Sequence, residues 1–208
     1  MPDPGPPGTT PEPTPDPQFV SRGGLKLHHA LTEFGLDPTG LICADLGCST
    51  GGFTDCLLQH GAARVHSVDT AYGEFAWKLR NDPRVVVHER SNALHFEPIE
   101  PVDLVVIDLG WTPQRLALPA AAKWLKPGGR IITLVKPHYE ADKSELGDKG
   151  VLDPVRAEQI AEAVRDGLPA LGFAVGGWTK SPVLGGASSK KKRKGSGNPE
   201  WLALVTPG

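Results

Sequence analysis

The chain has 208 residues, enough to bury the core of one domain, and a formal net charge of −2 at pH 7. Such a balance argues against wholesale non-specific binding to nucleic acid. No stretch approaches the roughly 18 apolar residues of a membrane-spanning helix. A membrane partner is therefore not expected.

The three cysteines, Cys43, Cys48 and Cys56, are odd in number and close together. Disulfides are therefore not expected, and a cytoplasmic location follows. Their spacing contains no C-x-x-C pair, which argues against zinc, so we expect no metal site. The N-terminus also lacks the basic and apolar regions of a secretory signal.

Proline dominates the N-terminal segment, with eight prolines among residues 1–17. Such a composition buries too little apolar surface to offset the entropy of ordering. We expect a disordered tail over residues 1–18 and a folded domain over residues 19–208. A ligand for an SH3-type domain is the alternative reading of the tail, although a solvated segment is favoured.

Helical and strand patterns alternate along the remaining chain. Helices are expected at residues 23–34, 51–60, 74–80, 113–125 and 154–170, the last interrupted near residues 167–169. Strands are expected at residues 41–46, 64–68, 85–88, 104–107, 130–135, 173–178 and 201–205. A turn is expected at Pro127-Gly128-Gly129.

This alternation predicts an α/β, Rossmann-like seven-stranded sheet that is largely parallel and covered on both faces. The last two strands follow each other without an intervening helix, which predicts a closing hairpin and one antiparallel strand. In sheets of this kind, ligands bind beyond the carboxyl ends of the strands.

A glycine-rich loop, Asp45-Leu46-Gly47-Cys48-Ser49-Thr50-Gly51-Gly52, follows the first predicted strand. Asp69 ends the second strand, 22 positions after Gly47 (69 − 47). A carboxylate at about this separation accepts hydrogen bonds from ribose hydroxyls, which indicates an adenosine-containing ligand. One alternative is an ordinary turn with a helix-capping acid. Another is a nicotinamide enzyme, although Gly47-Cys48-Ser49 departs from the G-x-G pattern.

Four charged residues stand at the ends of apolar runs or beside glycine-rich turns, namely Lys26, Asp108, Lys136 and Glu200. A lysine in a cleft usually pairs with a carboxylate or takes part in chemistry. If the four converge, they form an active site. For any one of them alone, a solvated surface ion pair is the alternative.

Six segments resemble the motifs of one known family and occur in the same order as in that family. They are residues 21–27 (SRGGLKL), 45–56 (DLGCSTGGFTDC), 68–73 (VDTAYG), 77–80 (WKLR), 82–85 (DPRV) and 134–137 (LVKP). Over residues 19–206 the chain resembles the TlyA/hemolysin-A-like branch of the FtsJ-type RNA 2′-O-methyltransferases. The resemblance implies a class I methyltransferase sheet. It also implies S-adenosyl-L-methionine as cofactor and RNA, above all ribosomal RNA or a ribosomal subunit, as partner. The family's Lys-Asp-Lys-Glu tetrad falls on the four charged residues.

Contacts to S-adenosyl-L-methionine are predicted for nine residues: Asp45, Gly47, Ser49, Gly51, Gly52, Phe53, Asp69, Asn92 and Asp108. Asn92 would bond the adenine edge, with an ordinary turn asparagine as the alternative. Lys136 is the predicted base that removes the hydroxyl proton. Burial and Lys26 would lower the pKa of Lys136 and Asp108 would raise it, so the net direction stays open.

Basic residues suggest where RNA phosphates bind: Arg22, Lys190, Lys191, Lys192, Arg193 and Lys194. Phosphate contacts strengthen binding in a salt-dependent way without reading sequence. A solvated loop is the alternative for the run 190–194.

The chain departs from the family pattern at several places, including the segment 147–153 and the basic run before Glu200, and two further departures bear on catalysis. Leu109-Gly110-Trp111 stands where the family tends to have Val-Ser-Phe, and a proline-rich segment stands where an S4-type RNA-binding domain is usual. These departures leave open a non-catalytic RNA-binding or ribosome-assembly factor that retains the fold. A methyltransferase acting on a small molecule or a protein is a third possibility, disfavoured by the basic run and the two lysines.

Overall fold

A computed structural model describes residues 18–147, 150–185 and 197–208. The proline-rich segment 1–17 and the basic run 190–194 lie outside these residues. The described strands are β1 Ile42–Leu46, β2 Arg64–Val68, β3 Val85–His88, β4 Val102–Ile107, β5 Leu125–Val135, β6 Phe173–Lys180 and β7 Trp201–Pro207. The α-helices are α1 Gly23–Glu33, α2 Gly52–Gln59, α3 Trp77–Arg80, α4 Gln114–Ala122, α5 Pro137–Glu140 and α6 Pro154–Gly167. Two 3-10 helices are η1 Lys143–Glu145 and η3 Leu168–Leu171.

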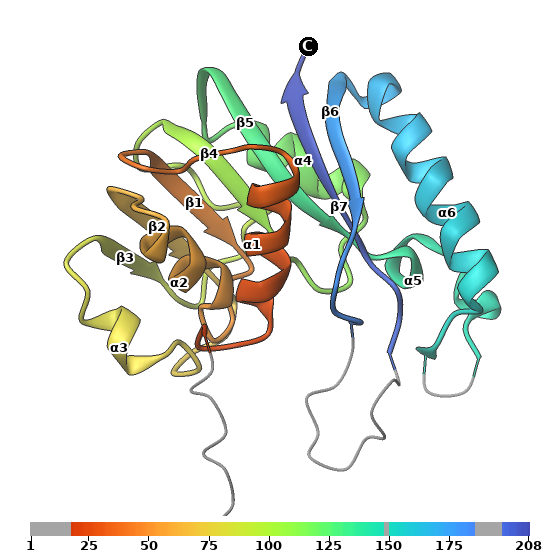
Figure 1. Ribbon diagram of the computed structural model, residues 1–208, viewed down its shortest axis with the longest axis horizontal. Helices are drawn as coiled ribbons and strands as arrows, with labels where there is room; N and C mark the ends of the chain where they lie inside the picture. The colour runs from red at the N-terminus through yellow and green to blue at the C-terminus, as the bar shows by residue number, and fades with distance from the viewer. Residues whose placement is uncertain (1–17, 148–149, 186–196) are drawn as a thin grey trace, which may run out of the picture.

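The seven strands form one sheet in the order β3-β2-β1-β4-β5-β7-β6 (Figure 1). The pairs among β1 to β5 are parallel, whereas β7 runs antiparallel to both of its neighbours, β5 and β6. The predicted α/β fold with one antiparallel strand is confirmed. The chain continues from β1 to β2 on one side and from β4 to β5 on the other. The loops at the carboxyl ends of these two neighbouring strands therefore border a cleft.

Helices cover both faces of the sheet (Figure 1). Leu27 of α1 and Leu57 of α2 pack in one buried cluster with Cys43 of β1. Leu118 of α4 packs with Ala44, the next residue of β1, in the cluster on the opposite face. This alternation is the two-residue period of a strand, and it explains why the predicted strands read as continuous apolar runs.

Several boundaries differ from the sequence prediction. The predicted turn at residues 127–129 lies within the long strand β5, whose register with β4 shifts between Val102 and Leu104. The short helices α5 and η1 were not predicted, because three or four residues hold too little periodicity. The long C-terminal helix is interrupted as expected, with α6 ending at Gly167 and η3 following.

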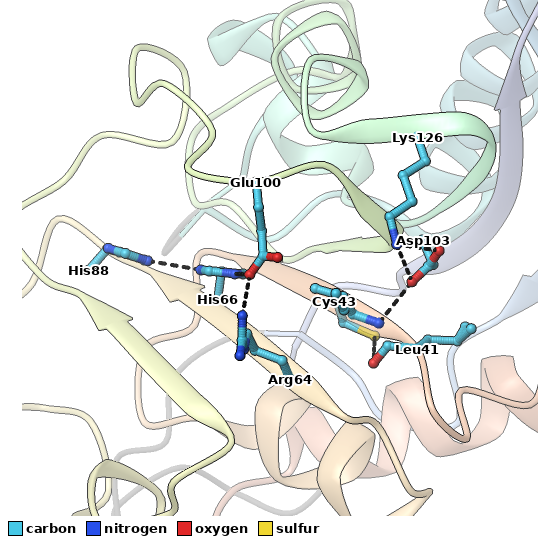
Figure 2. Close-up of polar contacts among 9 residues, drawn as sticks. Leu41, Cys43, Arg64, His66, His88, Glu100, Asp103 and Lys126 are labelled. Carbon is cyan, nitrogen blue, oxygen red and sulfur yellow. Dashed lines mark hydrogen bonds and ion pairs between the residues drawn. The ribbon is translucent and has the colours of Figure 1, made fainter.

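Polar networks join the strands within the sheet (Figure 2). Buried His66 of β2 contacts the Glu100 carboxylate at 2.8 Å and the His88 ring of β3 at 3.2 Å. Asp103 near the start of β4 accepts hydrogen bonds from the Ile42 amide and the Lys126 ammonium. These bonds fix the amino-terminal ends of β1, β4 and β5, whose opposite ends carry the loops described next. Within the described residues, no helix is long and apolar enough to cross a membrane.

Candidate active site

Two lysine–carboxylate pairs lie at the carboxyl end of the sheet. Asp108 follows β4 and Lys136 follows β5, and the Lys136 Nζ lies 2.5 Å from Asp108 Oδ1. Lys26 on α1 reaches Glu200, the residue before β7, with 2.5 Å between Nζ and Oε2. The four charged residues singled out by the sequence thus come from four separate segments and meet as two ion pairs.

The Lys136–Asp108 pair favours the charged form of both groups. Burial opposes ionisation of Asp108, but Lys136 and Lys26 outweigh it and lower the pKa of Asp108. Burial likewise disfavours the Lys136 ammonium, yet the Asp108 charge outweighs it and raises the pKa of Lys136. The Lys136 ammonium also donates a hydrogen bond to the Leu109 carbonyl at 3.1 Å. The direction that the sequence left open is therefore upward.

The Lys26–Glu200 pair is buried more deeply. The side chains of Lys26 and Glu200 are only 10% and 3% exposed. Burial raises the pKa of Glu200, and the nearby Lys26 charge opposes that rise. Gly185 packs directly against the Glu200 carboxyl group, so that any larger residue at position 185 would displace it.

The glycine-rich loop passes tightly across the end of β4. Gly47 has φ +91°, and a Cβ atom there would lie 2.6 Å from the Asp108 carbonyl oxygen. Gly51 has φ +100° and precedes the first turn of α2. Ser49 also has a positive φ of 47°, which is uncommon without glycine. The loop therefore presents backbone, with few side-chain atoms, toward the space beyond the strands.

Asp69 fixes the other side of this loop. Its carboxylate accepts hydrogen bonds from the Ser49 amide at 2.7 Å and from the Ala71 amide at 2.8 Å. Exposed Asn92 uses its side-chain oxygen to accept a bond from the Leu94 amide. Each carboxylate oxygen of Asp69 retains a second lone pair for a ligand.

Two adjoining cavities open at this end of the sheet. The first, of about 570 Å³, is lined in part by Arg22, Lys26, Gly52 and Phe53. The second, of about 550 Å³, is lined in part by Asp69, Asn92, Trp111 and Lys136. Gly47, Ser49 and Asp108 line both. Both volumes lie in the range of small-molecule and cofactor sites.

Two of the predicted cofactor residues line neither cavity, namely Asp45 and Gly51. Asp45 is fully buried, and one carboxylate oxygen accepts bonds from the amide and hydroxyl of Thr54. Its other oxygen has no hydrogen-bond partner within the part of the chain that the structure describes. Burial raises the pKa of Asp45 to about 7. The structure thus places Asp45 beneath the start of α2.

An aromatic cluster that sequence reasoning missed borders the second cavity. The Trp111 and Tyr139 ring centroids are 4.7 Å apart, and the Lys136 Nζ lies 5.3 Å from the Tyr139 centroid. Trp111 is 75% exposed, with φ +54°. Its place in the sequence had marked only a departure from the family pattern, and a positive φ at tryptophan has no sequence signal.

No group of three metal-ligating side chains occurs among the described residues.

The strand order and the glycine-rich loop at the end of β1 define a Rossmann-like methyltransferase fold. The solved N-methyltransferase NodS from Bradyrhizobium japonicum, in complex with S-adenosyl-L-homocysteine, shares this fold. Its TM-score is 0.58 at 16% identity, with 87% of this chain and 85% of that chain covered.

The sequence model of the FtsJ-like methyltransferases matches residues 19–191, and the chain belongs to this family. It is 43% identical over 171 residues to the 16S/23S rRNA (cytidine-2′-O)-methyltransferase TlyA of Mycobacterium tuberculosis. This alignment covers 80% of this chain and 64% of that relative. It is 35% identical over 191 residues to Hemolysin A of Brachyspira hyodysenteriae, covering 89% and 76%. A solved Streptococcus thermophilus protein that carries a hemolysin name has TM-score 0.81 and 39% identity, covering 91% and 67%. The chain thus spans just under two thirds of the mycobacterial relative.

Proposed function

We propose that this protein transfers a methyl group from S-adenosyl-L-methionine to a ribose 2′-hydroxyl of RNA, with ribosomal RNA as the substrate. The observation that carries the proposal is the meeting of two lysine–carboxylate pairs at the junction of two cavities. The name of the mycobacterial relative supports the reaction and the substrate class.

The second cavity fits the adenosine part of the cofactor. Asp69 has free lone pairs for the ribose hydroxyls, and Asn92 stands on the same wall for the adenine edge. A Cβ atom at Gly47 would clash with the backbone of Asp108, so the glycine allows the loops after β1 and β4 to pack closely. The cofactor supplies a methyl group that its sulfonium already activates. The two predicted residues outside the cavities, Asp45 and Gly51, would act by shaping the loop.

The chemical task left to the protein is to orient the hydroxyl and accept its proton. Lys136 is the proposed base. Since Asp108 favours the ammonium form, Lys136 must first release its own proton, and the positive charge of a bound sulfonium favours that release. Transfer would break the bond between the methyl group and the cofactor's sulfur, form the new carbon–oxygen bond and leave S-adenosyl-L-homocysteine, while the hydroxyl proton would pass to the Lys136 amine.

The buried Lys26–Glu200 pair would orient the ribose. Lys26 lines the first cavity, and its ammonium has donors beyond the one that Glu200 accepts. Arg22 lines the same cavity and would contact a phosphate next to the target nucleotide. The basic run 190–194, outside the described residues, remains a proposed phosphate contact. A cytoplasmic site of action belongs to the same proposal.

Ribose methylation in the cell tests this function. Mass-spectrometric mapping of ribosomal RNA from cells with and without the gene should show one or more 2′-O-methyl groups that depend on it. Identical methylation maps would contradict the proposal and favour a non-catalytic RNA-binding or assembly factor.

A further inference from the structure

An exposed aromatic–cation pair stands just outside the second cavity, and the proposed chemistry does not use it. Tyr72 lies after β2 and Arg90 lies after β3. The Arg90 guanidinium carbon is 4.2 Å from the centroid of the Tyr72 ring. Tyr72 nevertheless remains 67% exposed, so the ring is not part of the core.

The backbone holds this pair in place through several bonds. The Arg90 amide donates to the Ala71 carbonyl at 3.2 Å, which joins the two loops. The Gly73 amide donates to Glu89, and Arg80 makes two further bonds to the same carboxylate. Arg90 has φ +55°, a left-handed conformation that is uncommon for arginine. Strained residues of this kind cluster at ligand sites.

The position of the pair relates it to the proposed substrate. Residues 69–70 and 91–92, on the same two loops, line the second cavity. The carboxylate of Glu89, the nearest acid on the chain, is engaged by Arg80. Arg90 therefore presents a planar cation beside the wall of the second cavity.

An aromatic ring beside a guanidinium group suits an unpaired RNA base as ligand. Unpaired RNA bases stack on aromatic rings and on arginine guanidinium planes, and phosphates are attracted to the same cation. Arg90 stacks on the Tyr72 ring while much of the ring stays exposed, so the ring can still receive a base. Trp77, further along the same segment, is a second exposed aromatic residue.

We propose that the Tyr72–Arg90 pair is a stacking site for an unpaired nucleobase of the RNA substrate. The inference rests on the proposed function, because it takes RNA as the substrate. It adds a contact surface on the loops after β2 and β3, and it makes RNA binding depend on ring stacking as well as on charge.

A single-stranded RNA 12-mer that contains 2-aminopurine tests the site, because stacking quenches this base. Affinity is measured by anisotropy and stacking by quenching, for wild type, Tyr72→Ala, Tyr72→Phe and Arg90→Lys. Arg165→Ala is the matched control, since Arg165 also stacks on an aromatic ring, that of Trp178, at the other edge of the sheet (Figure 1).

Tyr72→Ala should weaken RNA binding about 5- to 100-fold and lose the quenching, the loss expected for one stacked base. Tyr72→Phe, which keeps the ring, and Arg165→Ala should bind within about twofold of wild type. Arg90→Lys, which keeps the charge and the Tyr72 ring but loses the guanidinium plane, should show an unchanged salt slope and a smaller loss of quenching than Tyr72→Ala. S-adenosyl-L-methionine affinity should stay unchanged in all variants.

Equal affinity and quenching for Tyr72→Ala and wild type would overturn the inference. So would an equal loss in Arg165→Ala, because it would indicate a general effect of charge or folding. Methylation of ribosomal RNA by the wild-type protein is assayed in parallel. Methylation without any effect of Tyr72→Ala overturns this inference alone, whereas stacking without ribose methylation overturns the proposed function alone.

Discussion

The Lys26 ammonium donates a hydrogen bond to the Glu200 carboxylate at 2.5 Å, across 174 positions of the chain. The pair joins the first helix of the domain to the segment entering the last strand. Because both groups are buried, neither can lose its partner without leaving an uncompensated charge in a low-dielectric setting. The same contact therefore serves the proposed site and the stability of the fold.

Glu200→Ala should lower the free energy of unfolding by about 3 kcal/mol and abolish methyl transfer, because it leaves the Lys26 charge unpaired. The double variant Lys26→Met/Glu200→Leu should recover most of the stability and none of the activity. Urea unfolding and methyl-transfer assays measure both. The exposed pair Lys123–Glu97 supplies the control, where Glu97→Ala should cost about 0.5 kcal/mol or less. Equal losses for Glu200→Ala and Glu97→Ala would contradict the buried-pair account.

Lys136→Arg should abolish methyl transfer and leave cofactor affinity near normal, because arginine keeps the positive charge but does not deprotonate in proteins. In the wild type, Asp108 holds the pKa of Lys136 above its ordinary value, and the reactive form is neutral. Turnover at saturating substrates should therefore rise with pH throughout the range from about 7 to 9, near tenfold per unit. A plateau beginning near neutral pH would show that another group accepts the proton.

Gly47→Val should abolish binding of S-adenosyl-L-methionine, because a Cβ atom there would lie 2.6 Å from the Asp108 carbonyl oxygen. Gly128 has a comparable φ of +78° with no atom near its Cβ position, so Gly128→Val tests backbone strain alone. Calorimetry should find normal cofactor affinity in that control and weak or no NAD binding in the wild type. Loss of cofactor binding in both variants would mean that unfolding explains the first result.

Much of the fold could be predicted because its strands are apolar runs bounded by glycine, proline or polar residues. The carboxyl-end position of Asp108 and Lys136 follows from the strand pattern alone. The short helices α5 and η1, and the continuation of β5 through Gly128, depend on neighbours in space and carry no local signal.

The electrostatics of the site were harder to predict from the sequence than the fold. The upward shift in the pKa of Lys136 arises from a competition between burial and Asp108, whose sign depends on a 2.5 Å contact. Asp45 reads as a cofactor ligand in the sequence, yet its carboxylate faces Thr54. Periodicity places a residue on a strand and does not determine which neighbour its side chain meets.

His138 should make the protein less stable in mild acid. Burial and the charges of Lys136 and Lys26 lower its pKa to about 4. The unfolded chain, with an ordinary pKa near 6.5, binds the proton first, so this contribution to stability is present above about pH 6.5 and is lost as pH falls toward about 4. Its full size is on the order of 3 kcal/mol. Unfolding of His138→Leu should show a flatter pH dependence than the wild type over this range, and parallel curves would contradict the assignment.

The most direct test of the proposed function is nucleoside mass spectrometry after reaction of the purified protein with ribosomal RNA and S-adenosyl-L-methionine. The wild type should produce 2′-O-methylated nucleosides, and Lys136→Ala should produce none while binding the cofactor with near-normal affinity. Methylation confined to the bases, or ribose methylation by Lys136→Ala at the wild-type rate, would contradict the account of Lys136 as the base that prepares a ribose hydroxyl.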